Sequence, residues 1–362
     1  MQRAKIYVDH THCGRHVTGL ERITQELFSQ EALAPLAVDI VSAPSRARMM
    51  LRQTFSLPAL AMRDRSAIFL TPGFPPSPAL TLFGARVLPY IHDVFLLTRR
   101  ADLNLRAKLY MAKPFAFAVA RLPAFLVNSE HTRRALAAFC RADADIALYR
   151  PQVRDVFGLG AGDRAARPPS PGGLRLVAVG TVEPRKNLLA AAAMIAALRQ
   201  RGQAQARLDI VGRIGWGDDA EKLRACEGVT LHGYLPAEAT RALIEGADAL
   251  ITTSHDEGLG LPLLEVQYAG LPVIAPDAPV FREVLGDSGW HVDPRDPGLA
   301  AQALEAWTAA PDWRARAAAQ AAANLARWNA AAAADKCAVI ARLARMAGAR
   351  MVCARMAGAE AP

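Results

Sequence analysis

Short apolar runs alternate with amphipathic segments along most of this chain, and that alternation limits the folds it can adopt. In the first half the apolar runs are KIYVD, VDIVSA, AIFLTP, VLPYIHDV, AFLVNSE and DIALYRP, each bounded by polar or turn residues. Runs of this length and composition are typical of buried parallel strands. Segments between them, such as LERITQELFSQ and HTRRALAAFC, have the apolar spacing of helices. The pattern predicts an α/β fold with a doubly wound parallel sheet.

The pattern stops and then starts again. Residues 158–173, GLGAGDRAARPPSPGG, have no apolar period and are rich in Gly, Pro and Arg, as linkers are. Strand-like runs then return as LRLVAVGT, ARLDIVGR, VTLHGYL, ALITTS and PVIAPD. A chain of 362 residues also exceeds what one compact core usually accommodates.

We therefore predict two Rossmann-like domains, over residues 1–157 and 174–330, joined by the linker at 158–173. Residues 331–362 are expected to form a C-terminal helix and a low-complexity tail. Ligands of such sheets bind beyond the carboxyl ends of the strands, so a cleft between the domains is the expected site.

Positive charge is concentrated in the first half. The net charge is +9, and residues 1–150 contain 20 Lys and Arg against 11 Asp and Glu, whereas residues 151–362 contain 23 of each kind. The densest basic segment, residues 99–122, also carries large apolar side chains. Its basic residues include Arg99, Arg100, Arg106, Lys108 and Lys113. Two interpretations stay open for it: an interfacial helix attracted to an anionic membrane surface, or a solvated helix that covers a sheet. Nucleic acid is not the expected partner.

Cysteine usage and the N-terminus bear on the compartment. The five cysteines (Cys13, Cys140, Cys226, Cys337 and Cys353) are scattered and lack C-x-x-C spacing, which favours a reducing compartment and no zinc site. The start MQRAKIYVDHTHCGRH has no apolar signal region, and no stretch has the roughly 18 to 20 apolar residues of a spanning helix. We expect a cytoplasmic protein, peripheral on the inner face of the cytoplasmic membrane.

The stretch TTSHDEGLGLPLLEVQYAGLPVIAPD, residues 252–277, carries the most specific chemistry. It predicts a strand that ends near Ser254, a glycine turn, and a helix with Pro262 in its first turn and Gly270 just past its end. Exposed amides at such a turn suit phosphate or sugar oxygens. Glu257 lies on the turn and Glu265 about one helical turn beyond it, and a carboxylate is suited to accept hydrogen bonds from hydroxyl groups.

This pair of glutamates resembles the Glu-x7-Glu motif of retaining glycosyltransferases of family 4, which have the GT-B fold. Other stretches match the family in its usual order. They are YIHDVF, VNSEHTRRAL and TGLERITQEL in the first half, and VGTVEPRKNLLAAAAMI, LDIVGRIGWG, LHGYLPAEATRALIEGADALI and PVFREVLGDSGWHVDP in the second. The resemblance covers about residues 4–340. Two departures are EGLG, where the family often has EGFG, and Phe281 with Arg282 before Glu283, which leaves acceptor specificity open.

The resemblance implies roles for individual side chains. Arg185 and Lys186 would neutralise the diphosphate of a sugar nucleotide, on which negative charge grows as the glycosidic bond breaks. Glu257 would hold hydroxyls of the donor sugar and Glu265 the ribose. His92, after the strand RVLPYI, would lie near the transferred sugar.

Backbone and ring contacts to the donor follow from the same resemblance. After the first strand, Gly14 and Gly19 would let the backbone approach phosphates or acceptor. A second group would contact the base: Gly233, Tyr234 and Leu235. The alternative for Tyr234 is a position in the core. The glycine turn would contribute Gly258, Leu259, Gly260 and Leu261.

The predicted function is transfer of a hexose with retention of its anomeric configuration. The stretches GTVEPRKN and GLPLLEVQYAG are most similar to those of bacterial mannosyltransferases, so the expected donor is GDP-mannose and the expected acceptor a lipid-linked or growing surface polysaccharide. No D-x-D-like cluster appears, and no metal or other cofactor is expected because the basic pair would clamp the diphosphate.

Other functions stay open or are disfavoured. Another sugar nucleotide in the same reaction, a sugar-nucleotide epimerase on the same fold and a non-catalytic glycan-binding protein are the alternatives. An epimerase would need acid and base groups that flank the sugar, and the first half offers only His92 in such a place. The absence of G-x-G-x-x-G after the first strand disfavours a nicotinamide dehydrogenase.

Overall fold

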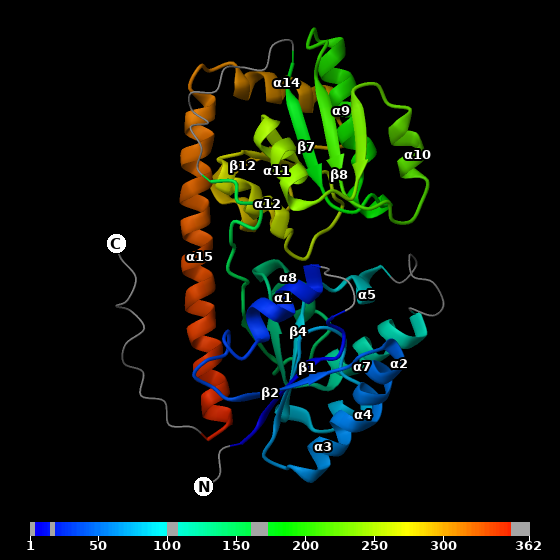
Figure 1. Cartoon of the computed structure of the whole chain (residues 1–362), viewed down its shortest axis with the longest axis vertical. Coiled ribbons are helices and arrows are strands. Elements are labelled where there is room, and N and C mark those ends of the chain that lie inside the picture. The colour runs from blue at the N-terminus through cyan, green and yellow to red at the C-terminus, as the bar shows by residue number, and fades with distance from the viewer. Residues whose placement is uncertain (1–3, 15–18, 100–107, 161–172, 349–362) are drawn as a thin grey trace. The chain divides into compact units, whose positions relative to one another are not determined.

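The protein divides into two compact units, which Figure 1 shows in a computed structural model. The structure describes residues 4–14, 19–99, 108–160 and 173–348. Unit 1 comprises Met1–Pro151 with Ala331–Pro362, and unit 2 comprises Gln152–Ala330. The chain thus passes into unit 2 before the predicted linker, of which residues 161–172 lie outside the described residues, as does most of the C-terminal tail.

Unit 1 is built on a six-stranded parallel sheet with the order β2-β1-β3-β4-β5-β6. Its strands are β1 (Ile6–His10), β2 (Val38–Ser42), β3 (Ile68–Thr71), β4 (Val87–Ile91), β5 (Ala124–Val127) and β6 (Asp145–Leu148). Its helices are α1 (Gly19–Phe28), α2 (Arg46–Leu51), η1 (Arg52–Ser56), α3 (Leu57–Arg63), α4 (Pro78–Thr81), η2 (Gly84–Arg86), α5 (Phe95–Thr98), η4 (Lys108–Ala112), α7 (Lys113–Arg121) and α8 (Glu130–Ala137).

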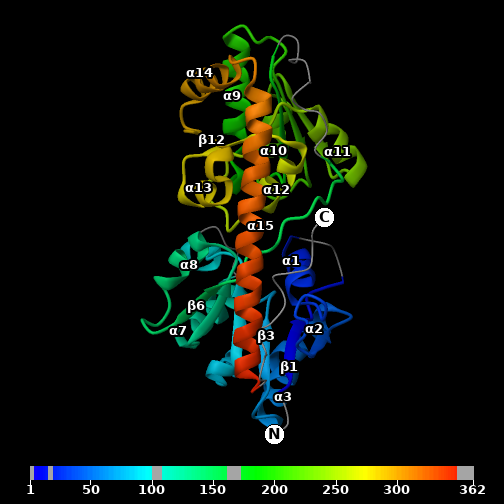
Figure 2. The same cartoon turned by 90° about the vertical axis from the view of Figure 1, so that its left-hand side faces the viewer.

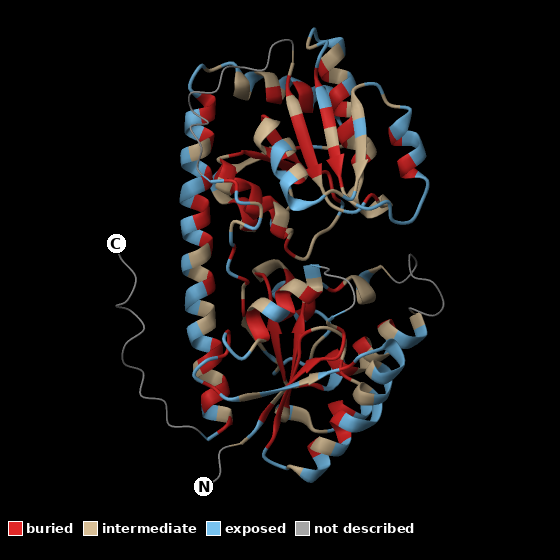
Figure 3. Cartoon of the chain, viewed as in Figure 1, coloured by how far each residue is buried: buried red, intermediate tan, exposed pale blue. Residues whose placement is uncertain are grey.

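Burial across this sheet follows strand position. Every residue of β3, β4 and β5 is buried, whereas no residue of β2 or β6 is. Figure 3 shows the contrast between the inner strands and the outer ones. The prediction of buried strands is therefore wrong for β2 and β6, because an edge strand has a neighbour on one side only.

The basic segment 99–122 is divided between two environments. Residues 100–107, with Arg106, lie outside the described residues. Phe115 and two further residues of α7 are buried in the core beside β4 and β5, so α7 is the helix that covers a sheet. In η4, however, Leu109 and Tyr110 are exposed. The apolar residues of this segment do not form one interfacial face.

Unit 2 has a second six-stranded parallel sheet, with the order β12-β11-β10-β7-β8-β9. Its strands are β7 (Arg175–Val179), β8 (Arg207–Val211), β9 (Val229–Gly233), β10 (Ala249–Ile251), β11 (Val273–Pro276) and β12 (Gly289–Val292). Its helices are η6 (Pro184–Lys186), α9 (Leu188–Gln200), α10 (Asp219–Arg224), α11 (Ala237–Gly246), α12 (Leu261–Glu265), η7 (Val266–Ala269), α13 (Pro279–Leu285), η8 (Gly286–Ser288) and α14 (Pro297–Thr308). The predicted pair of doubly wound parallel sheets is confirmed. Strand β12 was absent from the predicted strands, because its sequence GWHV is only four residues long and contains just two apolar residues.

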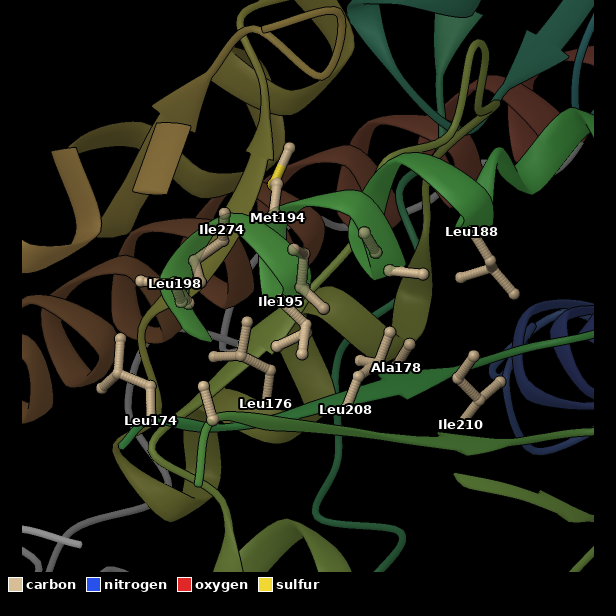
Figure 4. Close-up of a cluster of buried hydrophobic side chains, with 14 of the residues drawn as sticks. Leu174, Leu176, Ala178, Leu188, Met194, Ile195, Leu198, Leu208, Ile210 and Ile274 are labelled. Atoms are coloured by element: carbon tan, nitrogen blue, oxygen red, sulfur yellow. The ribbon is translucent and has the colours of Figure 1, made fainter. Parts of the chain in front are cut away.

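The core of unit 2 forms between α9 and the sheet. Figure 4 shows Ile195 of α9 above Leu176 of β7 and Leu208 of β8. Small residues such as Ala191, which is fully buried, let the helix approach the strands closely. Because α9 is apolar around most of its circumference, it must be covered on its outer side as well. Helix α14 provides that cover, and Figure 2 shows the two helices next to each other.

The long helix α15 (Trp313–Met346) contributes to both units. In unit 2, Arg314 forms an ion pair with Asp248 at 2.7 Å, with both side chains buried. In unit 1, Asp335 accepts a hydrogen bond from the Arg150 guanidinium at 2.8 Å. Over the described ranges, no helix is both long enough and apolar enough to cross a bilayer.

Candidate active site

The strand order of unit 2 reverses between β7 and β10, and a pocket lies at the carboxyl ends of these two strands. Such a reversal is where α/β sheets bind their ligands, because the loops after the two strands diverge there. The pocket is open, and its empty space, counted out into the solvent, is about 440 Å³. Its polar lining comes from both loops and includes Thr181 and Lys186 after β7, and Ser254 and Glu257 after β10.

Hydrogen bonds between the two loops fix the backbone that carries the basic pair. The hydroxyl of Thr253 donates to the carbonyl of Asn187 at 2.7 Å and to that of Lys186 at 3.2 Å. The amide of His255 donates to the carbonyl of Arg185 at 3.0 Å. Asn187 has a left-handed backbone with φ of 49°, which ends η6 and starts α9. The loops therefore hold each other in place.

Glu257 joins the two loops through its carboxylate. Oε1 accepts hydrogen bonds from the Lys186 ammonium and from the Ser254 hydroxyl, the latter at 2.9 Å. Oε2 accepts from the Arg185 guanidinium at 3.2 Å. Burial alone would raise the pKa of Glu257, but the ion pairs with Lys186 and Arg185 outweigh burial and hold that pKa below its ordinary value. Glu257 is therefore ionised at neutral pH.

Arg185 has further anionic partners. Its guanidinium donates to Glu183 Oε1 at 2.9 Å and to the carbonyl of Asp256 at 2.8 Å. Burial lowers the pKa of Arg185, and the carboxylates of Glu257 and Glu183 raise it above its ordinary value by more. Two cations and two carboxylates thus lie beside the pocket, and their charges balance. In this arrangement Lys186 can bind an anionic ligand and Glu257 can accept hydrogen bonds from one. The sequence identified three of these four charges and missed Glu183.

The glycine turn contributes Gly260 to the pocket lining, and its two leucines are buried. Leu259 and Leu261 are only 4% and 8% exposed and do not line the pocket, whereas Gly260 between them does. Gly260 has φ of 77°, a conformation that favours glycine. Gly258 is half-buried on the same turn. Glu265, the last residue of α12, is buried and does not line the pocket.

A close approach of backbones shapes the floor of this region. A Cβ atom on Gly212, which follows β8, would lie 1.8 Å from the carbonyl oxygen of Gly180, which follows β7. No side chain can be accommodated there without a backbone shift. Gly180 itself lines the pocket, so a shift at Gly212 would be transmitted to the site.

The predicted base contacts lie at the carboxyl end of β9. Tyr234 is 70% exposed, so the alternative of a core tyrosine is wrong. The guanidinium of Arg213, which follows β8, lies 5.1 Å from the centre of its ring. Gly233 ends the strand with φ of 69°, and Leu235 is half-buried. Arg213 was not among the predicted residues, although its place two positions after the end of β8 was a signal for it.

In unit 1, His92 directly follows β4. Its Nε2 donates to the carbonyl of Pro72 at 2.7 Å, and its own carbonyl accepts from the Asn128 amide at 2.8 Å. Burial lowers the pKa of His92, against smaller opposite effects of Pro72 and of Asp93. The imidazole is therefore neutral at pH 7, with Nδ1 as its acceptor atom. It lines a pocket of unit 1 whose walls are mainly apolar, from α5, α7 and the loop after β3.

The loop after β1 is described in part. Gly14 has φ of 91° and its amide donates to the Glu21 carboxylate, whereas Gly19 is the first residue of α1. Residues 15–18 between them lie outside the described residues. A Cβ atom on either glycine would meet no atom of the described residues within 4 Å, so packing against them does not require a glycine at either position.

A buried polar cluster at the end of β1 was not predicted. The carboxylate of Asp9 accepts from the Thr11 hydroxyl at 2.6 Å and from the Gln53 amide at 3.1 Å. Burial raises the pKa of Asp9 in spite of these hydrogen bonds. The sequence signal was DHTH, a polar run that covers the last two residues of β1 and the two that follow. Among the described residues, no group of three or more His, Cys, Asp or Glu is arranged to hold a metal ion.

Two doubly wound parallel sheets in one chain define the two-domain α/β architecture called GT-B, which solved glycosyltransferase structures share. Sucrose-phosphate synthase from Thermosynechococcus elongatus superposes with a TM-score of 0.70 over 94% of this chain and 99% of that chain, at 16% sequence identity. At that identity the likeness shows the fold alone.

Sequence relatives identify part of the chain more narrowly. Residues 163–324 match the family Glycosyl transferases group 1, so this stretch is a glycosyltransferase group 1 domain. It is homologous to two proteins of Escherichia coli. Serotype-specific mannosyltransferase WbdA is 36% identical over 139 residues, which are 37% of this chain and 17% of that protein. O-antigen chain mannosyltransferase B is 32% identical over 123 residues, which are 33% of this chain and 32% of that protein. The chain therefore matches less than a third of the length of either relative.

Proposed function

We propose that this chain is a retaining, family 4 glycosyltransferase that transfers a hexose, with mannose from GDP-mannose as the donor, to a lipid-linked or growing surface polysaccharide. The observation that carries the proposal is the cluster of Arg185, Lys186 and Glu257 at the strand reversal of a glycosyltransferase group 1 domain. Homology to two mannosyltransferases supports the choice of sugar.

The electrostatics of the cluster support its proposed roles. When the bond between the anomeric carbon and the phosphate oxygen breaks, negative charge grows on the leaving diphosphate. Lys186 and Arg185 are fixed cations that stabilise this charge without reorganisation. Glu257 is ionised and already accepts three hydrogen bonds, so it is suited to bind hydroxyls and not to donate a proton. We assign it no role as a nucleophile.

Retention then follows a front-face course. The acceptor hydroxyl forms the new bond to the anomeric carbon on the face from which the diphosphate leaves, and its proton passes to the departing phosphate oxygen. His92 is proposed to orient a sugar hydroxyl through Nδ1, because the lowered pKa leaves it neutral. Metal is proposed to be unnecessary, since the Lys186 ammonium lines the pocket and the Arg185 guanidinium binds the same Glu257 carboxylate beside it.

Thermal stabilisation by nucleotides is the first test. We would measure unfolding with GDP, UDP, ADP and their sugars at saturating concentration, each in the presence of a chelator. A ligand at 100 times its Kd stabilises the folded protein by about 2.7 kcal/mol. Stabilisation by GDP and GDP-mannose alone is the expected result. Stabilisation by UDP-sugars would change the donor, and stabilisation by no nucleotide would overturn the enzyme assignment.

A matched pair of variants tests the site itself. Lys186→Ala should abolish the nucleotide-dependent shift, because it removes the ammonium that meets the diphosphate. Lys222→Ala is the control, since Lys222 is an exposed lysine of the same unit whose partner is Asp218 and which does not line the pocket. Equal nucleotide shifts in both variants would refute the role of Lys186.

Product analysis separates the alternatives. With labelled GDP-mannose and a lipid-linked glycan acceptor, a retaining transferase yields an α-linked product whose anomeric configuration NMR determines. An epimerase would convert the sugar nucleotide without any acceptor. A non-catalytic glycan-binding protein would leave the donor intact, even over long incubation. Transfer that stops on addition of a chelator would contradict metal independence.

We also propose peripheral attachment to an anionic membrane surface through the basic unit 1, because a lipid-linked acceptor is held at such a surface. The excess positive charge of residues 1–150 supports this attachment.

A further inference from the structure

Large apolar side chains are exposed along one helical segment of unit 1, residues 46–63, which comprises α2, η1 and α3. Met50, Leu51, Phe55 and Met62 are 53%, 54%, 65% and 69% exposed. Isolated exposed apolar residues are ordinary, but four within 13 positions are a concentration that points to an interaction surface. Figure 3 shows this segment as mostly exposed or intermediate.

The same segment is strongly and purely basic. Residues 46–63 contain Arg46, Arg48, Arg52 and Arg63 and no acidic residue. Arg46, Arg48 and Arg63 are exposed, whereas the Arg52 guanidinium also donates to the carbonyl of Ser42. Exposed apolar side chains combined with arginines are the composition of helices that lie in the interface of an anionic bilayer.

Helical spacing places three of these residues, Leu51, Phe55 and Met62, on a common side. Leu51 and Phe55 are four positions apart and so neighbour each other, and Met62 follows Phe55 by about two turns. Another face of the segment holds it to the protein, because Leu57 and Ala61 are buried in the core of unit 1. The segment is thus anchored and presents a second apolar face outward.

A side-chain contact fixes the middle of the segment as well. Gln53 of η1 donates to Asp9 at 3.1 Å and to the Thr11 hydroxyl at 2.9 Å, both at the end of β1. A helix held by a core and by such hydrogen bonds does not need to order itself on binding.

We propose that the face of residues 46–63 that carries Leu51, Phe55 and Met62 is the surface by which this protein docks on an anionic lipid bilayer. The inference rests on the proposed membrane attachment and gives it a place other than residues 99–122. A bilayer is favoured over a protein partner because the charges are of one sign and flank the apolar side chains, which suits lipid headgroups above acyl chains. The apolar side chains enter the interface, and the arginines meet the headgroup phosphates.

The test is partitioning of the whole protein onto vesicles of phosphatidylcholine alone or mixed with phosphatidylglycerol. The wild type should bind the mixed vesicles, with weaker binding at high salt. Phe55→Ser with Met62→Ser should reduce the partition coefficient at least tenfold, and Arg48→Gln with Arg63→Gln should weaken its salt dependence. Leu299→Ser, at a 60% exposed position in unit 2, is the control and should bind like the wild type.

Three outcomes would overturn the proposal. One is failure of the wild type to bind mixed vesicles. Another is unchanged vesicle binding by the Phe55→Ser, Met62→Ser variant. Loss of vesicle binding in a Leu109→Ser, Tyr110→Ser variant would then place the membrane contact in residues 99–122. The third is a wild-type dimer in solution that this variant converts to a monomer, which would make the face a contact between copies.

Nucleotide-dependent thermal shifts, measured on the same samples, separate this proposal from the proposed function. Vesicle binding lost with nucleotide shifts intact is the expected result for the Phe55→Ser, Met62→Ser variant. If the wild type is stabilised by nucleotide but does not bind vesicles, the docking face alone is refuted. If it binds vesicles but is not stabilised by any nucleotide, the proposed function alone is refuted.

Discussion

Replacement of Glu257 by Gln should destabilise unit 2 by an amount that its ion pairs determine. The side chain keeps its shape but loses its charge, and it faces the Lys186 ammonium and the Arg185 guanidinium at 10% side-chain exposure. Arg185 retains Glu183 at 2.9 Å. Lys186 has no other carboxylate partner in the part of the chain that the structure describes, so it bears most of the loss.

The expected loss of stability in Glu257→Gln lies between two limits. Exposed ion pairs contribute about 0 to 1 kcal/mol, and removing one partner of a fully buried pair costs about 3 to 5 kcal/mol. The Lys186 and Arg185 side chains are 21% and 26% exposed, so solvent partly screens the unpaired charge. We expect a loss of about 2 kcal/mol, in line with hydrogen bonds to charged groups. With a urea dependence of about 2 kcal/mol per M, the unfolding midpoint should fall by about 1 M.

Tryptophan fluorescence makes the assay specific for unit 2. All five tryptophans lie between residues 216 and 328, and therefore within Gln152–Ala330. Urea titration followed by selectively excited tryptophan emission thus reports unfolding of that unit. Glu245→Gln is the matched control, because Glu245 pairs with Arg241 at 2.7 Å with side chains 39% and 45% exposed. Its midpoint should change little.

The pH dependence gives a second readout with a definite sign. The pKa of Glu257 is lower in the folded protein than its ordinary value of 4.5. Its stabilising contribution is therefore complete above about pH 5 and is lost as pH falls through the lowered folded pKa. The difference in unfolding free energy between wild type and Glu257→Gln should therefore be constant from about pH 6 to 8. It should shrink below about pH 4.5, where the Glu257 carboxylate takes up a proton. Equal midpoints for the two proteins at pH 7 would refute the ion-pair reasoning.

Three further predictions follow from other contacts. Arg314→Met breaks a buried ion pair and should cost unit 2 about 3 to 5 kcal/mol in the same urea assay, whereas Arg316→Met, at an exposed pair, should cost less than about 1 kcal/mol; similar losses would contradict the assigned burial. Gly212→Ala forces the backbone away from the carbonyl of Gly180 and should weaken nucleotide binding in calorimetric titration; wild-type affinity would show that the two loops tolerate a shift. The imidazole of His92 should titrate below its ordinary pKa of 6.5 by NMR, so its contribution to stability is complete above that pH and lost as pH falls through the lowered value; titration at or above 6.5 would exclude a buried neutral ring.

Local sequence identified most of the candidate site because the signals were local. The strand, the glycine turn and the start of α12 follow from residues 249–262, and Gly270, expected just past the helix end, has the left-handed backbone typical of that position. Glu183 and Asp9 were missed. Glu183 pairs with Arg185 two positions away, and it joins the site only because Arg185 also meets Glu257 in the loop after β10. Asp9 is joined to a distant element by the Gln53 amide.

Two basic, apolar helices show what local sequence leaves open. Residues 46–63 and 113–121 both combine arginine or lysine with aromatic side chains. Phe115 is 3% exposed and Phe55 is 65% exposed. Amphipathic spacing defines an apolar face, but the elements that pack against the helix decide whether that face is covered.

The alternation of short apolar runs with helical segments determined by itself that this chain forms two parallel α/β sheets, because period and length of the apolar runs fix the secondary structure. The strand order was decided only by the tertiary structure. Arg185 and Glu257 are 72 positions apart in sequence, yet they form an ion pair because β7 and β10 are neighbours in the sheet. Parallel strands end at the same edge, so the reversal of strand order between them turns two separate loops into one site.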